Sequence, residues 1–218
     1  MGTRAEAAGP RFDRDFRERL LALFHWRRDV RRFRADPVDD ETLDRLIAAA
    51  CLAPSVGLSQ PWRFVIVDDP IRRAAIVETF TRCNQDALAA YAPDAAVHYA
   101  RLKLEGLRTA PRHLAIFADE TTGQGRGLGR ATMPEMARYS VVAAIDHLWL
   151  AARAEGIGMG WVSILEPAAV HAALDTPATW TLIGYFCLGF PEVDDDTPEL
   201  EREDWEHRRP GDAFVIRR

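Results

Sequence analysis

The sequence is poor in cysteine, which limits the chemistry to be expected of it. Its three cysteines, Cys51, Cys83 and Cys187, are odd in number and widely spaced. A disulfide framework or a zinc site needs paired cysteines at short, regular spacings, and the sequence has none. Cys51 and Cys187 lie in apolar segments, so we expect them to be small core residues rather than nucleophiles.

Long apolar runs and an excess of positive charge are also missing. No apolar run approaches the roughly 20 residues that a membrane helix needs, and residues 1–17 lack the apolar stretch of a secretion signal. We therefore expect a cytoplasmic protein without a membrane partner. The net charge of −5 argues against a nucleic-acid partner, because domains that bind nucleic acid are usually basic.

Three common catalytic and cofactor motifs are absent. No serine stands in a G-x-S-x-G context. The six histidines show no ligand spacing such as H-x-x-x-H, so we expect no metal. Four glycines between 123 and 129 are spaced by two, which differs from the G-x-G-x-x-G pattern of dinucleotide sites. We interpret this stretch as a flexible loop.

The hydrophobic pattern predicts one domain over residues 1–218, of the α+β class or of the α/β class with irregular insertions, because 48% of the 218 residues are hydrophobic and can form one substantial core. We predict strands at 64–67, 113–118, 157–164 and 180–188. We predict helices at 13–25, 41–52, 71–80, 134–155 and 167–174. The helix at 134–155 should be the longest. Its apolar surface predicts a central position and an interface with a second subunit.

Three segments are expected to lie outside this core. Residues 1–11 look disordered, and residues 192–218 form a C-terminal extension. The acidic run from 194 to 206 within that extension should be solvated, extended chain. Residues 81–110 are poorly periodic, and Asn84, Gln85, Tyr91 and the alanine-rich pieces indicate broken helices around Pro93. Such a segment is typical either of a lid over a binding site or of an irregular surface excursion.

Arginine is concentrated in the stretch Arg27-Arg28-Asp29-Val30-Arg31-Arg32-Phe33. Guanidinium groups at this density suit an anion, and their planar fork suits phosphate. The alternative is a solvated basic loop. Asp29 stands among the arginines, and in their field we expect it to stay ionised well below its ordinary pKa of roughly 4.

Two further segments have the composition of a ligand site. The loop at 53–62 is rich in proline, glycine and serine, and the predicted strand at 157–164 carries two glycines. Glycine in a strand often marks the close approach of the backbone to a ligand. With the arginine stretch, these segments can hold a ligand with a phosphate at one end and a planar hydrogen-bonding ring at the other. A phosphorylated flavin has this shape.

The same segments, taken in order, resemble the FMN-dependent nitroreductase family. The resemblance runs from about residue 20 to 209. It is carried by Arg27-Arg28-x-x-Arg31-x-Phe33, Ala-Pro-Ser-x-x-x-x-Gln-Pro-Trp (53–62), Gly-x-Gly-Trp-Val (158–162) and Leu-Gly-Phe-Pro (188–191). It implies a mixed central sheet flanked by helices, in a homodimer with flavin sites and a long central helix at the interface.

Within that family the chain looks most like the BluB-type 5,6-dimethylbenzimidazole synthases. Asp29 stands where ordinary nitroreductases commonly have serine, and Leu58 where they commonly have asparagine. The resemblance implies that reduced FMN is a substrate, fragmented with O2 to 5,6-dimethylbenzimidazole, the lower ligand of vitamin B12, and erythrose 4-phosphate. A separate flavin reductase would supply the reduced FMN. The alternatives are an NAD(P)H-dependent FMN nitroreductase or flavin reductase, and a non-catalytic flavin-binding protein.

The resemblance also implies roles for individual residues. Asp29 and Ser163 would be catalytic: Asp29 as a base towards the ribityl chain or a holder of a proton-relay water, and Ser163 as a hydrogen-bond donor to the flavin ring. The phosphate or ribityl chain would be held by Arg27, Arg28, Arg31 and Arg208. The remaining residues expected to contact the flavin are Val30, Ser55, Gly160 and Trp161.

Overall fold

A four-stranded sheet forms the centre of the protein, whose computed structural model describes residues 9–92 and 105–218. The strands are β1 (Trp62–Ile66), β2 (Arg112–Asp119), β3 (Gly158–Val162) and β4 (Trp180–Gly189). They are ordered β1-β2-β4-β3, and every neighbouring pair is antiparallel. Strands β1 and β3 are therefore the edges of the sheet.

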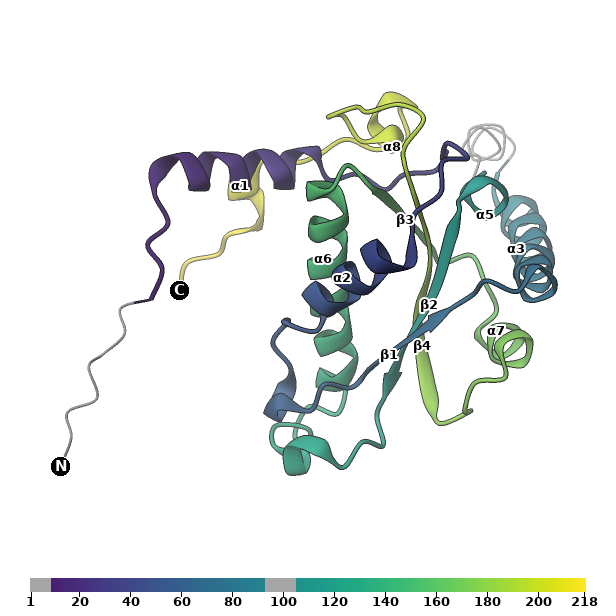
Figure 1. Cartoon of the computed structure of the whole chain (residues 1–218), viewed down its shortest axis with the longest axis horizontal. Helices are drawn as coiled ribbons and strands as arrows, with labels where there is room; N and C mark the ends of the chain where they lie inside the picture. The colour runs from purple at the N-terminus through teal and green to yellow at the C-terminus, as the bar shows by residue number, and fades with distance from the viewer. Residues whose placement is uncertain (1–8, 93–104) are drawn as a thin grey trace.

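Helices cover both faces of this sheet (Figure 1). Helices α2 (Asp40–Ala50) and α6 (Met136–Ala154) lie on one face, and α3 (Pro70–Ala90) and α7 (Pro167–Leu174) lie on the other. Side chains of β2 alternate between the two cores: Leu114 and Ile116 pack with α2 and α6, whereas Ala115 and Phe117 pack with α3 and α7. The predicted α+β class is confirmed.

Short polar signals in the sequence set where the helices begin. The Asp39 carboxylate accepts a hydrogen bond from the Thr42 backbone N–H at 2.7 Å and caps α2. The Asp69 carboxylate caps α3 in the same way through the Ile71 N–H, with Pro70 at the first helical position. Such caps satisfy N–H groups that have no partner within the helix.

Two expectations about the helices are wrong. Helix α3 has 21 residues and α6 has 19, so the helix after Pro134 is not the longest. Helix α3 continues through residues 81–90, where broken helices were expected, because no proline or glycine interrupts the sequence before Pro93. Of the expected lid at 81–110, residues 93–104 lie outside the described residues.

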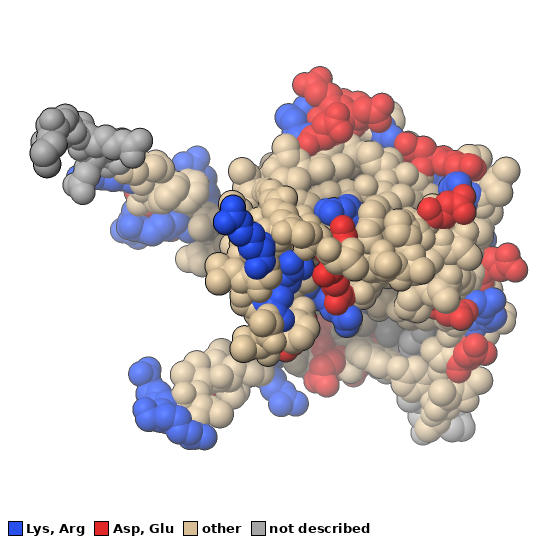
Figure 2. All heavy atoms as spheres, turned by 90° about the horizontal axis from the view of Figure 1, so that it is seen from below, with Lys and Arg blue, Asp and Glu red and all other residues tan. Residues whose placement is uncertain are grey.

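Helix α1 (Arg14–Trp26) projects from the body of the protein (Figure 1) and contains no buried residue. Its apolar side chains Phe16 and Phe24 are 39% and 46% exposed. Basic side chains dominate the two projecting terminal segments in Figure 2, whereas acidic ones are spread over the body. The described part of one protomer therefore covers the apolar side chains of α1 only in part.

The remaining helical segments are short: η1 (Val56–Leu58), α5 (Gly106–Thr109), η2 (Gln124–Gly127), α8 (Glu199–Arg202) and η3 (Gly211–Phe214). Cys187 is 1% exposed in β4, which confirms its expected place in the core. Cys51 is partly buried and packs against the core beside α2. None of the helices in the described ranges is both long and apolar enough to cross a membrane.

Candidate flavin site

The arginine stretch is fixed against edge strand β3. The Val30 N–H donates to the Met159 carbonyl at 3.0 Å, and Asp29 and Met159 form an isolated parallel bridge. The same segment is fastened further along, where the Arg34 N–H donates to the Phe190 carbonyl at 2.8 Å. The stretch thus adds one isolated parallel bridge beside a sheet whose four strands are all paired antiparallel.

The two glycines of β3 make room for this pairing. A Cβ atom at Gly158 would lie 2.6 Å from the Val30 side chain, and one at Gly160 would overlap the Val30 carbonyl oxygen. The glycines of this strand were expected to mark the close approach of a ligand, and within the protomer it is protein atoms that approach them. In this protomer the approaching backbone is the arginine stretch itself, so these glycines position Asp29.

The Asp29 carboxyl group is held at both oxygens. Its Oδ1 accepts a hydrogen bond from the Trp161 backbone N–H at 2.8 Å, and its Oδ2 lies 3.5 Å from the Arg31 Nε. Desolvation raises the pKa of Asp29 above its ordinary value, against the opposing effects of the Trp161 N–H, Arg31 and Arg27. The expected lowering of this pKa is wrong, because the penalty of burial exceeds the attraction of the arginines.

Buried guanidinium nitrogens next to Asp29 lack hydrogen-bond partners. The Nε atoms of Arg28 and Arg31 are both buried and neither makes a hydrogen bond. Burial, followed by the charges of Arg208 and Arg27, lowers the pKa of Arg28. Buried donors without partners are uncommon and costly in proteins. They indicate that an anion normally completes this site.

A small cavity brings the four expected arginines together. It is lined by Arg27, Arg28, Asp29, Arg31, Pro198, Glu199, Leu200 and Arg208. Arg208 comes from the C-terminal extension, and the other three arginines come from the stretch after α1. The orphaned Nε atoms and the charge of the lining fit the phosphate group of a flavin mononucleotide.

Helix α6 supports the stretch from behind. The indole N–H of Trp149 donates to the Arg28 carbonyl at 3.0 Å, and the Arg27 guanidinium stacks over the same indole at 4.8 Å. The Trp149 ring also lies near Trp161, with centroids 6.4 Å apart. Two tryptophans therefore fix the backbone that presents Asp29.

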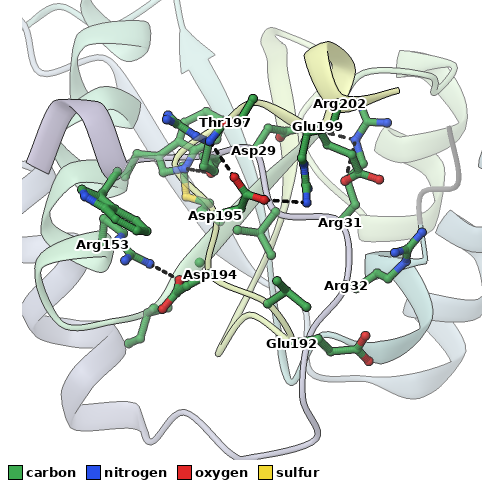
Figure 3. A pocket seen from close by; sticks show the side chains of 18 residues that line it. Asp29, Arg31, Arg32, Arg153, Glu192, Asp194, Asp195, Thr197, Glu199 and Arg202 are labelled. Atoms are coloured by element: carbon green, nitrogen blue, oxygen red, sulfur yellow. Dashed lines mark hydrogen bonds and ion pairs between the residues drawn. The ribbon is translucent and has the colours of Figure 1, made fainter. Parts of the chain in front are cut away.

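The acidic segment after β4 is the part of the site that sequence reasoning missed. It was expected to be solvated, but residues 192–199 line a second cavity on the arginine stretch (Figure 3). Asp194 pairs with Arg153, and Asp195 pairs with Arg202 at 2.9 Å. Glu199 lies 3.9 Å from the Arg31 Nε. The alternation of acidic and basic runs in the sequence is the signal that could have indicated this packing.

Ser163 and Ser55 are placed differently from the arginines. Ser163 is exposed and directly follows β3, the strand whose Trp161 N–H holds Asp29. The Ser55 hydroxyl accepts a hydrogen bond from the Gln60 N–H at 3.1 Å within its own loop. That loop is attached to the start of α6, where the Val56 N–H donates to Ser140 Oγ at 3.0 Å. Within one protomer, Ser55 is therefore not brought to the arginine cavity.

Comparison with known proteins places the chain in a family. The family model described as "Nitroreductase family" matches residues 25–190. A protein of Rhodospirillum rubrum named 5,6-dimethylbenzimidazole synthase is 61% identical over 202 residues, covering 93% of this chain and 96% of that protein. The chain belongs to the nitroreductase family. Within this family it is similar to the 5,6-dimethylbenzimidazole synthases.

Solved structures share the fold. An oxidised iodotyrosine deiodinase bound to FMN and 3-iodo-L-tyrosine superposes with a TM-score of 0.72 at 24% identity, covering 91% of this chain and 97% of that chain. A BluB-like flavoprotein from Clostridium difficile gives a TM-score of 0.66 at 22% identity, covering 90% and 97%. Among the residues that the structure describes, no group of histidine, cysteine, aspartate and glutamate is arranged to hold a metal ion.

Proposed function

We propose that this protein catalyses the O2-dependent fragmentation of reduced FMN to 5,6-dimethylbenzimidazole and erythrose 4-phosphate, so that FMN is its substrate. The observation that carries this proposal is Asp29, a partly buried carboxyl group beside buried arginine Nε–H groups that make no hydrogen bond. The similarity to named 5,6-dimethylbenzimidazole synthases supports the same reaction.

The arginine cavity holds the phosphate end of the flavin. Arg28 and Arg31 supply the buried Nε–H donors, and Arg27 and Arg208 add charge at the rim. Charge-assisted hydrogen bonds of this kind are about twice as strong as neutral ones. Asp29 lines the same cavity, and Ser163 directly follows β3, so these two residues would serve the ribityl chain and the ring of the flavin.

Asp29 moves a proton near the ribityl chain. The reduced flavin supplies the electrons for O2 and the carbon skeleton of the products. A carboxylate with a lowered pKa is a weak base, and the raised pKa of Asp29 brings it closer to the range in which general bases work. Its Oδ1 is held by the Trp161 N–H, and its Oδ2, which lies 3.5 Å from the Arg31 Nε, is the oxygen that acts on the substrate or on a relay water. Ser163 donates a hydrogen bond to the ring.

The working form is a homodimer with flavin sites at its interface. Helix α1 leaves the apolar side chains of Phe16 and Phe24 partly exposed, and α6 exposes Tyr139 (54%) and Val142 (42%). A second copy can cover these faces and bring its own loop at 53–62 to the arginine cavity. A flavin reductase supplies the reduced FMN, and physical contact with it is not required.

The experiment that tests this proposal is a product assay. The protein is incubated with FMN, a chemical or enzymatic reductant and air, and 5,6-dimethylbenzimidazole is measured by mass spectrometry. We expect product to form with O2 and to be absent under nitrogen. Flavin recovered intact, together with steady NAD(P)H oxidation when a nitroaromatic is added, would overturn the proposal in favour of a nitroreductase.

A further inference from the structure

Glu199 and Asp29 are the two carboxylates in the arginine cavity, and Glu199 is the one that comes from the C-terminal extension. Its side chain is 15% exposed, and it lines the cavity with Arg27, Arg28, Arg31 and Arg208. Its Oε2 lies 3.9 Å from the Arg31 Nε, and that nitrogen makes no hydrogen bond. Glu199 is therefore close enough to compete for Arg31 but does not satisfy it.

The surrounding segment holds Glu199 in place. It is the first residue of α8, directly after Pro198. The turn before it is fixed by Asp195, whose carboxylate accepts from the Thr197 N–H at 2.7 Å and pairs with Arg202 (Figure 3). The position of Glu199 in the cavity is therefore fixed by the backbone around it. A phosphate group that enters the cavity lies close to the negative charge of Glu199.

We propose that Glu199 limits the affinity of this site for the phosphate group of its ligand. The inference rests on the proposed function, because it takes the flavin phosphate to occupy the arginine cavity. A cofactor can stay bound for many turnovers, but a substrate must enter and its products must leave. Both FMN and the expected second product are phosphate esters, and a carboxylate beside Arg31 repels each of them.

If Glu199 has a purely structural role, its removal should change the affinity for FMN in the opposite direction. If Glu199 served only to hold Arg31 in position, its removal would disorder Arg31 and weaken FMN binding. If it competes with phosphate, removal of its charge strengthens FMN binding. The sign of the change in affinity therefore separates the two roles.

The test compares two ligands that differ only in the phosphate. The dissociation constants of oxidised FMN and of riboflavin are measured by flavin fluorescence, without reductant, for the wild type and for Glu199→Gln. We expect the variant to bind FMN about five- to tenfold more tightly, the effect of removing one unit charge a few ångströms away in a solvated site. Riboflavin binding should change by less than about twofold.

Matched variants exclude general charge effects. Asp194→Asn removes one negative charge from the same segment, but its partner Arg153 does not line the arginine cavity, so the ratio of FMN to riboflavin affinity should stay near that of the wild type. Glu199→Asp keeps the charge and should also keep that ratio. If Glu199→Gln is destabilised in thermal unfolding, Glu199→Ala provides a second neutral side chain.

Two results overturn the inference. One is an unchanged or weaker affinity of Glu199→Gln for FMN, and the other is an equal gain for riboflavin. Either result leaves the proposed function standing if the wild type still forms 5,6-dimethylbenzimidazole. A wild-type protein that binds neither flavin overturns both proposals.

Discussion

The arginine stretch and the loop at 53–62 are both expected flavin contacts, yet the fold treats them differently. The stretch is attached to the end of α6 through Trp149, and the loop to its start through Ser140. These two anchors are nine residues apart, or about 14 Å along a helix. Within one protomer, the stretch, which includes Asp29, lines the arginine cavity, whereas the loop lies elsewhere. The difference teaches that a motif can mark a ligand surface without showing which protomer supplies it.

The largest effect should come from breaking the attachment of the arginine stretch. In Gly160→Val, the new side chain overlaps the Val30 carbonyl, so the stretch must leave β3. We expect a loss of stability of about 1–3 kcal/mol, as for overpacked sites, and loss of measurable FMN binding. Thermal unfolding and FMN titration measure the two effects.

The matched control for this change is Gly123→Ala. A Cβ atom at Gly123 meets nothing within 4 Å, and its φ of −75° suits alanine. This control should bind FMN like the wild type. If Gly160→Val also bound FMN normally, the attachment to β3 would not position the site.

The next largest effect should come from neutralising the carboxylate of Asp29 alone. Asp29→Asn keeps an oxygen for the Trp161 N–H but cannot accept a proton, so we expect product formation to fall at least about a hundredfold, as for loss of a general base. FMN binding should be largely kept. In the wild type, the rate should decline as pH falls through the raised pKa of Asp29, and this dependence should vanish in the variant.

The same substitution should stabilise the protein at neutral pH. Because the pKa of Asp29 is raised in the folded state, the folded state binds more protons than the unfolded state just above pH 3.8. Stability is therefore lost as pH rises through this window and is not regained above it. Asp29→Asn removes that loss, so its gain in melting temperature should shrink as the pH is lowered towards 3.8. A gain that is constant with pH would contradict this account.

Mixed dimers test whether the arginine stretch and the loop at 53–62 of one site come from different protomers. Arg31→Ala and Ser55→Trp should each be inactive as homodimers. If a site takes the stretch from one protomer and the loop from its partner, each mixed dimer contains one intact site. Equal mixing should then restore about a quarter of wild-type activity, since half the dimers are mixed and half their sites are intact. Absence of any recovery would place both segments of a site in one protomer.

The smallest effect should come from Ser163→Ala. The residue is exposed and supplies one hydrogen bond to the ring, which is worth about 1 kcal/mol or a few-fold in rate. Product formation should fall several-fold while the dissociation constant of FMN stays close to that of the wild type. A loss as large as that of Asp29→Asn would assign Ser163 a role in proton transfer.

Local patterns in the sequence predicted the four strands and the helix starts because each depends on short-range signals, such as Asp39 before α2. The continuation of α3 was missed because Asn84 and Gln85 suggested a break that the absence of proline and glycine overrides. The raised pKa of Asp29 could not be predicted, since the neighbouring charges are visible in the sequence and burial is not. The packing of Glu199 against Arg31 joins residues 168 positions apart and needs the tertiary structure.

The pairing of Val30 with Met159 also affects solubility. Strand β3 is an edge of the sheet, and an exposed edge is a template for aggregation with other chains. The arginine stretch covers part of this edge. A ligand that anchors the stretch also keeps the edge closed. Supply of flavin during expression should therefore protect this protein from aggregation as well as prepare it for catalysis.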